Sequence, residues 1–231
     1  MRLADLGERS GVPLATVKYY LREGLLPPGQ RVSATRAEYD ESHLRRLRLV
    51  RAMIQVGRLP VATVREVLAH VDDESLGTSI RLGAALWALP HSAGGSEQEA
   101  GPAAGPAAEP AEPEQADPAR AAADALVGEL LAELGWDAAR EIGGLSPAHR
   151  ALVAALATLH RLGYAFTAAD LLPYARTMEQ AAGHDLDRME QLPDTRARVE
   201  YAVAGAVLFE PVLLNLRRIA QAEQSTRRYG I

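Results

Sequence analysis

A segment rich in alanine, glycine and proline divides the chain. Residues 91–118 contain five prolines, and no Lys or Arg occurs between Arg81 and Arg120. A segment of this composition cannot bury enough apolar surface to offset the entropy that it would lose on ordering. We therefore predict a disordered linker over residues 91–118, with a folded domain on each side of it.

Charge is distributed unequally between the two sides. Residues 1–71 carry 12 Lys and Arg against 7 Asp and Glu, whereas residues 72–231 carry 13 against 23. A basic front and an acidic rear are typical of a nucleic-acid-binding module joined to a domain that avoids nucleic acid, although ordinary scatter of surface charge is the alternative. The chain has no Cys, which excludes disulfides, thiolate metal sites and thiol redox switches.

Several classes of protein do not fit this sequence. No run approaches eighteen apolar residues without a charge, and the stretch Met1–Asp5 lacks the apolar core of a secretory signal. We therefore expect a cytoplasmic protein with no membrane partner. No Ser/His/Asp set, phosphate-binding loop or metal motif occurs, so we predict that the protein is not an enzyme and uses no cofactor.

Apolar residues recur at helical spacing on both sides of the linker. Pro211 lies inside the last of these patterns and predicts a kink or break near Glu210. Residues 30–39 predict a small hairpin. The predicted helices cover residues 3–9, 13–23, 40–56, 60–71, 75–89, 119–134, 136–142, 147–162, 167–190 and 194–227. The predicted fold is mainly α, with a winged helix-turn-helix domain at 1–74, a short dimerisation or connector helix at 75–90, the linker, and an all-helical effector or dimerisation domain at 119–231.

The helix-turn-helix prediction rests on spacing. Gly7, Gly11 and Val17 lie at offsets of four and six, and two helices that cross steeply need a small residue, a turn glycine and a branched apolar residue there. The predicted packing residues are Leu3, Leu6, Val12, Leu14 and Leu21. The second helix would expose Ala15, Thr16, Lys18, Tyr19 and Arg22, and its width suits the major groove of DNA. A two-helix corner of another helical domain is the alternative.

A longer pattern runs through the first part of the chain. It consists of Gly11, Val12, Thr16, Val17, Tyr19, Tyr20, Gly24, Leu25, Leu26 and Pro27, followed by Tyr39, Asp40, His43, Leu44 and Leu47. Through these residues, residues 1 to about 72 resemble the N-terminal domain of the MerR family of bacterial transcription regulators and match its sequence pattern. The chain departs from it at three positions, because Lys18 replaces the usual Arg, Leu21 the usual Glu, and Ala15 a frequent Arg. The wing's Gly-Tyr-Arg is also absent, and residues 34–37 stand in its place.

The resemblance implies that the second helix reads the major groove while the wing contacts the flanking backbone. Seven residues become candidate DNA contacts: Thr16, Lys18, Tyr19, Tyr20, Arg22, Arg36 in the wing, and Arg58 before a helix N-terminus. Tyr20 could equally belong to the core. We interpret the arginines at 45, 46, 48 and 51 mainly as a solvated helix face. The resemblance further implies double-stranded promoter DNA, a second copy of the chain, and RNA polymerase as partners.

The residues behind the linker carry weaker signals. Family members end in an effector domain, and a small organic effector could bind a pocket lined by Trp136, Tyr164, Tyr174 and Tyr201, with Phe166 and Phe209 nearby. The alternative is that these rings form the core. Residues 184–190 offer one His and several carboxylates, which we interpret as a solvated face and not a metal site.

Two questions stay open at this point. The stretch Val199–Ile219 predicts either a buried core helix or a dimer face. The function predicted is a sequence-specific transcription regulator, and the alternative is a DNA-bound scaffold whose C-terminal domain docks a protein partner without a small ligand.

Overall fold

The computed structural model describes residues 1–33, 36–90 and 117–230. It divides the chain into unit 1, made of Met1–Leu89 and His184–Ile231, and unit 2, made of Pro90–Gly183. This division differs from the predicted domains, because the last helix belongs with the helix-turn-helix and not with a domain at 119–231. The predicted linker lies outside the described residues except for its last two positions, which begin a helix.

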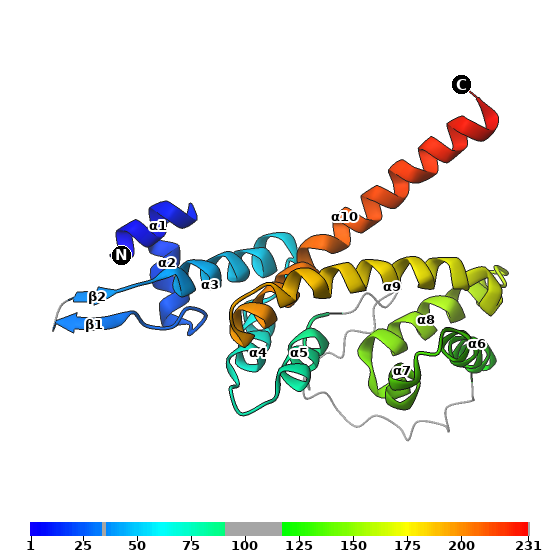
Figure 1. The fold of residues 1–231 in the computed structure, drawn as a ribbon, viewed down its shortest axis with the longest axis horizontal. Coiled ribbons are helices and arrows are strands. Elements are labelled where there is room, and N and C mark those ends of the chain that lie inside the picture. The colour runs from blue at the N-terminus through cyan, green and yellow to red at the C-terminus, as the bar shows by residue number, and fades with distance from the viewer. Residues whose placement is uncertain (34–35, 91–116, 231) are drawn as a thin grey trace, which may run out of the picture. The chain divides into compact units, whose positions relative to one another are not determined.

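Unit 1 begins with a helix-turn-helix and a wing (Figure 1). The two helices are α1 (Leu3–Ser10) and α2 (Leu14–Arg22), close to their predicted bounds. The wing is an antiparallel pair of short strands, β1 (Gln30–Ser33) and β2 (Arg36–Glu38), with an irregularity in register between Arg31 and Ser33. The mainly α fold and the predicted hairpin are confirmed.

Three helices complete the N-terminal part of unit 1. They are α3 (Glu41–Arg51), α4 (Val61–Asp72) and α5 (Thr78–Trp87). The carboxylate of Asp40 caps α3 by accepting hydrogen bonds from the backbone N–H groups of Ser42 and His43, and side-chain hydrogen bonds from these two residues hold the pKa of Asp40 well below its usual range. The predicted helix 40–56 ends differently, because its last turn, η1 (Ala52–Val56), is a π-helix.

The C-terminal helix α10 (Thr195–Tyr229) completes the core of unit 1. Val199, Val203 and Val207 are buried among α3, η1, α4 and α5, so the first half of the stretch 199–219 is a core helix. Of the predicted kink or break near Glu210, a break is excluded, because α10 continues through Pro211. Here the helix is exposed, where water can satisfy the backbone carbonyl that proline leaves without a donor.

By length and composition alone, α10 would be long and apolar enough to cross a membrane, and 22% of its most apolar window is buried. The sequence analysis did not identify α10 as a candidate span, because it required a run of about eighteen apolar residues without a charge. Helices of soluble cores meet the same test, and the buried valines of α10 show that its first half packs as one.

A buried cluster of charged side chains joins α10 to α3 and α4. Arg46 is 1% exposed and pairs with Asp72 and with Glu200, whose side chain is 6% exposed. Arg196 pairs with the same two carboxylates, at 3.0 Å from Asp72 and 3.5 Å from Glu200. The interpretation of Arg46 as part of a solvated helix face is therefore wrong. The reason is that α10, about 150 residues further along the chain, covers this side of α3.

Unit 2 is helical throughout its described residues. It contains α6 (Pro118–Leu134), α7 (Asp137–Ile142), the 3-10 turn η2 (Gly143–Leu145), α8 (Pro147–Arg161) and the first part of α9 (Ala168–Glu190). Its core is the contact between α6 and α8, with the buried side chains of Ala119, Ala123, Val127, Leu131, Val153, Leu156 and Ala157.

The helix ends of unit 2 are specified locally. Asp117 caps α6 through Ala119, and Pro118 occupies the first helical position, where a missing N–H costs little. Thr167 and Asp170 form a reciprocal cap of α9, with the Thr167 N–H donating to Asp170 at 2.9 Å and the Asp170 N–H donating to the Thr167 hydroxyl oxygen at 3.3 Å.

Candidate DNA-binding surface

The turn between α1 and α2 has the geometry that the glycine spacing predicted. Gly11 adopts a left-handed φ of 65°, and a Cβ at Gly7 would approach the carbonyl oxygen of Val12 to 3.1 Å. Leu6 and Val17 are fully buried. Leu14 is 41% exposed, so its predicted packing role is wrong: it occupies the first helical position of α2, at the edge of the core.

An arginine outside the motif holds this turn in place. Arg51, in the last turn of α3, donates hydrogen bonds to the backbone carbonyl oxygens of Ser10 at 3.0 Å and Gly11 at 3.5 Å. Arg65 on α4 pairs with Glu23 at 3.0 Å, just beyond α2. These contacts fix the orientation of α2 on the rest of unit 1.

Helix α2 presents polar side chains on the side away from the core. Lys18 and Arg22 are exposed, while Thr16 and Tyr19 are half-buried. The Arg22 guanidinium lies 5.4 Å from the centre of the Tyr19 ring, a cation–π contact that orders both side chains. Four of the predicted contact residues therefore share one exposed face of the proposed recognition helix.

Tyr20 does not belong to this face. Its side chain is 5% exposed and lies in the core of unit 1, with its ring centre 5.9 Å from that of Tyr19. Burial raises the pKa of Tyr20, and Arg51 acts in the opposite direction. We therefore assign Tyr20 to the core and remove it from the candidate DNA contacts.

The wing is fixed at its base. The N-terminal ammonium group of Met1 donates to the carbonyl oxygen of Tyr39 at 2.7 Å, and the Tyr39 N–H donates to the carbonyl oxygen of Met1 at 2.9 Å. A Cβ at Gly29 would lie 2.6 Å from the carbonyl oxygen of Glu38, so only glycine fits there. Arg36 begins β2, and its side chain lies outside the described residues.

Arg31 is a basic residue that the sequence reasoning missed. It lies on β1, all of whose side chains are exposed. Arg31 could have been identified from the sequence as a candidate DNA contact, because it lies in the same predicted hairpin as Arg36.

Arg58 occupies a strained position between η1 and α4. It is exposed, and its φ of 56° makes it the one non-glycine residue with positive φ in the described ranges. Pro60 precedes the first turn of α4 and provides no side-chain cap, and Pro13 likewise leaves α2 without one. Both helices thus begin with N–H groups that can bind a phosphate oxygen, one of them beside the Arg58 guanidinium.

The four aromatic residues predicted for a ligand pocket are divided between the two units. Tyr201 belongs to unit 1, and Tyr174 is 57% exposed on the part of α9 that belongs to unit 2. Trp136 packs against the core of unit 2 and donates from its indole N–H to Glu179 at 3.0 Å. Tyr164 does line a hollow of about 180 Å³ between α6 and the end of α8, together with Phe166. Phe209 is on α10, in unit 1.

Residues 184–190 carry one His and several carboxylates. Across residues 1–33, 36–90 and 117–230, no three His, Asp or Glu side chains are grouped so that they could hold a metal ion. The carboxylates of this stretch lie exposed along the second half of α9.

Comparisons with known proteins agree with this geometry. The family described as MerR HTH family regulatory protein matches residues 1–71. The chain is similar to the HTH-type transcriptional regulator ZntR homolog of Haemophilus influenzae, at 36% identity over 50 residues, and to the HTH-type transcriptional regulator AdhR of Bacillus subtilis, at 32% over 57 residues. These segments cover 22% and 25% of the chain but only 37% and 41% of the two relatives.

A crystal structure provides a comparison over the full length. SCO5550 of Streptomyces coelicolor A3(2), a protein proposed to be a transcriptional regulator, is 56% identical, and the match covers 100% of this chain and 99% of that one with a TM-score of 0.78. With the helix-turn-helix and wing in place and the family match over both, residues 1–71 are a helix-turn-helix domain of the MerR family.

Proposed function

We propose that the protein is a DNA-binding transcription regulator that recognises its operator with α2. The observation that carries this proposal is the face of α2 on which Thr16, Lys18, Tyr19 and Arg22 lie together, unobstructed by the core. Lys18 is the residue of this face best able to reach a base edge, because it is exposed and forms no ion pair among the described residues. Arg31 and Arg58 would contact the phosphate backbone on either side.

Capture of genomic fragments by the purified full-length protein tests this proposal. We expect the wild type to enrich a recurrent inverted repeat within promoters at moderate salt, and Lys18→Ala to lose about 1–3 kcal/mol of specific binding, roughly tenfold or more. Arg176→Ala, which removes one positive charge from an exposed position on α9, should bind as the wild type does. Equal enrichment by the wild type and Lys18→Ala would show that α2 is not the recognition helix.

Two substitutions at Arg58 separate its backbone strain from its charge. Arg58→Gly should stabilise the protein by about 1 kcal/mol, because glycine adopts positive φ without steric cost, while Arg58→Ala should not stabilise it. Both should weaken binding to all DNA sequences alike and reduce the slope of log K against log salt concentration by about 0.9. Thermal unfolding and fluorescence anisotropy at several salt concentrations measure the two effects. An unchanged salt slope in both variants would remove Arg58 from the phosphate contacts.

We further propose that the protein acts as a homodimer through the second half of α10. Apolar side chains recur there at helical spacing and stay exposed: Leu208, Phe209, Val212, Leu216 and Ile219, which are between 37% and 66% exposed. A soluble protein rarely leaves such a stripe uncovered, and a second copy supplies the identical apolar stripe. One small winged module also makes few contacts, so paired half-sites are needed for tight specific binding.

Unit 2 is the natural place for an effector. It has its own core and its own hollows, and it contains none of the helix-turn-helix residues. We therefore propose that a small organic molecule binding to unit 2 controls the affinity of unit 1 for DNA, and that RNA polymerase is the machinery that responds.

A further inference from the structure

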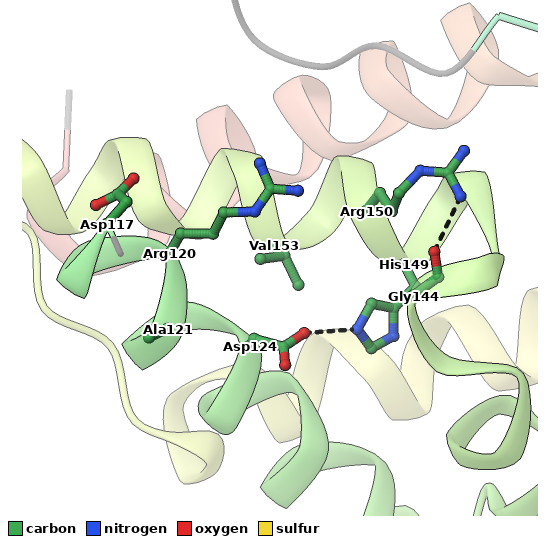
Figure 2. A pocket seen from close by; sticks show the side chains of 8 residues that line it. All are labelled: Asp117, Arg120, Ala121, Asp124, Gly144, His149, Arg150 and Val153. Atoms are coloured by element: carbon green, nitrogen blue, oxygen red, sulfur yellow. Dashed lines mark hydrogen bonds and ion pairs between the residues drawn. The ribbon is translucent and has the colours of Figure 1, made fainter. Parts of the chain in front are cut away.

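A hollow of about 410 Å³ lies between α6 and the beginning of α8 (Figure 2). Its walls include Asp117, Arg120 and Asp124 of α6 and His149, Arg150 and Val153 of α8. A neighbouring hollow of about 370 Å³ shares Asp124 and His149 with it and adds Arg140. The volume is within the usual range of small-molecule sites.

The acidic side chains of this hollow already have partners. One Asp117 oxygen accepts from the backbone N–H of Ala119 at 3.0 Å, and the other accepts from the Arg161 guanidinium at 2.7 Å. Asp124 is 3.1 Å from Nε2 of His149, which is the contact drawn in Figure 2. Both carboxylates therefore have direct partners other than Arg120 and Arg150.

The two arginines, by contrast, have no carboxylate partner in the part of the chain that the structure describes. Arg150 is anchored by its Nη1, which donates to the carbonyl oxygens of Gly144 and Leu145 at 2.9 Å each, so its other nitrogens are available. Arg120 makes none of the hydrogen bonds or ion pairs found among the described residues. Figure 2 shows the two guanidinium groups directed to the same side of the hollow. Guanidinium groups that form no ion pair with a carboxylate can bind the oxygens of an anion in bidentate fashion.

The surface beneath the arginines is apolar. Ala121 is exposed and forms part of the hollow's lining together with Val153, which lies beneath it in the core. An inorganic anion would leave the apolar lining of the hollow in contact with water. An organic anion would cover this lining, and the burial of apolar surface would strengthen its binding.

We propose that this hollow binds a small organic anion, with its carboxylate or phosphate group on Arg120 and Arg150 and its apolar part on Val153. The proposal names the class of effector for the regulator and so rests on the function proposed above. Arg120 is the specificity-determining residue, since it has no structural contact to lose. Arg150 is preorganised by the two carbonyl oxygens that it binds.

Ligand-observed NMR titration of the full-length protein tests the site without DNA. The probes are benzoate, phenyl phosphate and benzamide, of which the last has the shape of benzoate without its charge. We expect at least one anion to bind with a dissociation constant on the order of 1 mM, and benzamide to bind at least tenfold more weakly. Binding of only one of the two anions identifies whether a carboxylate or a phosphate is preferred.

Two variants locate the binding. Arg120→Gln should weaken the bound anion at least tenfold without changing the unfolding temperature, while Arg176→Gln on α9 loses the same charge and should leave binding unchanged. Absence of binding by both anions, equal binding of benzamide, or no effect of Arg120→Gln would overturn the proposal. Operator binding is measured separately, so a protein that binds DNA but neither anion would refute the site and leave the regulator function standing.

Discussion

Glu200→Ala is expected to lower the free energy of unfolding by about 3 kcal/mol or more. The substitution leaves the side chain of Arg46, which is 1% exposed, with Asp72 as its remaining acidic partner, and Asp72 also pairs with Arg196. Burial raises the pKa of Glu200, and Arg46 and Arg196 act against this. Removing the carboxylate therefore removes the group that compensates a buried positive charge. Urea unfolding followed by circular dichroism measures the loss.

A second variant distinguishes the role of charge from that of packing. Several polar atoms of the cluster, including Nε and Nη1 of Arg46, are buried without a hydrogen-bond partner. Arg46→Met combined with Glu200→Leu should therefore recover most of the lost stability, because apolar side chains of similar volume need no partner. Glu210→Ala, at an exposed position of the same helix, should change stability by less than about 0.5 kcal/mol. A double variant as unstable as Glu200→Ala would contradict this account of the cluster.

Leu216→Asp is expected to convert the proposed dimer to a monomer and to lower operator affinity by roughly a hundredfold or more, because paired half-sites would then be bound independently. Leu216 belongs to the exposed stripe and is 56% exposed, so a carboxylate there would be buried only in the dimer. Sedimentation velocity and fluorescence anisotropy on the captured operator measure the two effects.

Leu214→Asp is the matched control for the dimer. Leu214 is 45% exposed, but two residues along a helix place it about 160° around the axis from Leu216 at roughly 100° per residue. This variant should remain dimeric and bind the operator normally. Dissociation of both variants alike would mean that the apolar stripe is not what pairs the two copies.

Local signals in the sequence predicted the elements of unit 1 well. Gly11 must adopt positive φ and Gly7 must be small where the two helices touch, and both requirements can be read from residues close together in the chain. The approximate helix bounds followed from apolar spacing. The face of α2 followed in turn, since burial of Val17 and Tyr20 leaves Lys18 and Arg22 outside.

The wrong prediction for Arg46 has a different cause, which is packing between segments far apart in the chain. The pattern of α3 shows one apolar face, but the side that carries Arg46 is buried as well, because α10 covers it. No local pattern contains that information. The predicted aromatic pocket draws on residues of both units, because Tyr201 belongs to unit 1 and Trp136 to unit 2. The π-turn η1 was also unpredicted, because its apolar spacing resembles that of an ordinary helix.

The packing of α10 on the DNA-reading half has a consequence for the order of folding. Gly57 lies so close to Val207 that a Cβ there would approach it to 2.7 Å, and Val199 and Val203 fill the same core. During synthesis, the helix-turn-helix leaves the ribosome well over a hundred residues before these valines do. Until α10 is synthesised, the core of unit 1 stays incomplete, with its apolar surface and Arg46 exposed to solvent. Contacts between residues so far apart in the chain also form late in folding. In a nascent or truncated chain, the helix-turn-helix would therefore rest on an incomplete core. Only a chain synthesised through α10 could bind the operator.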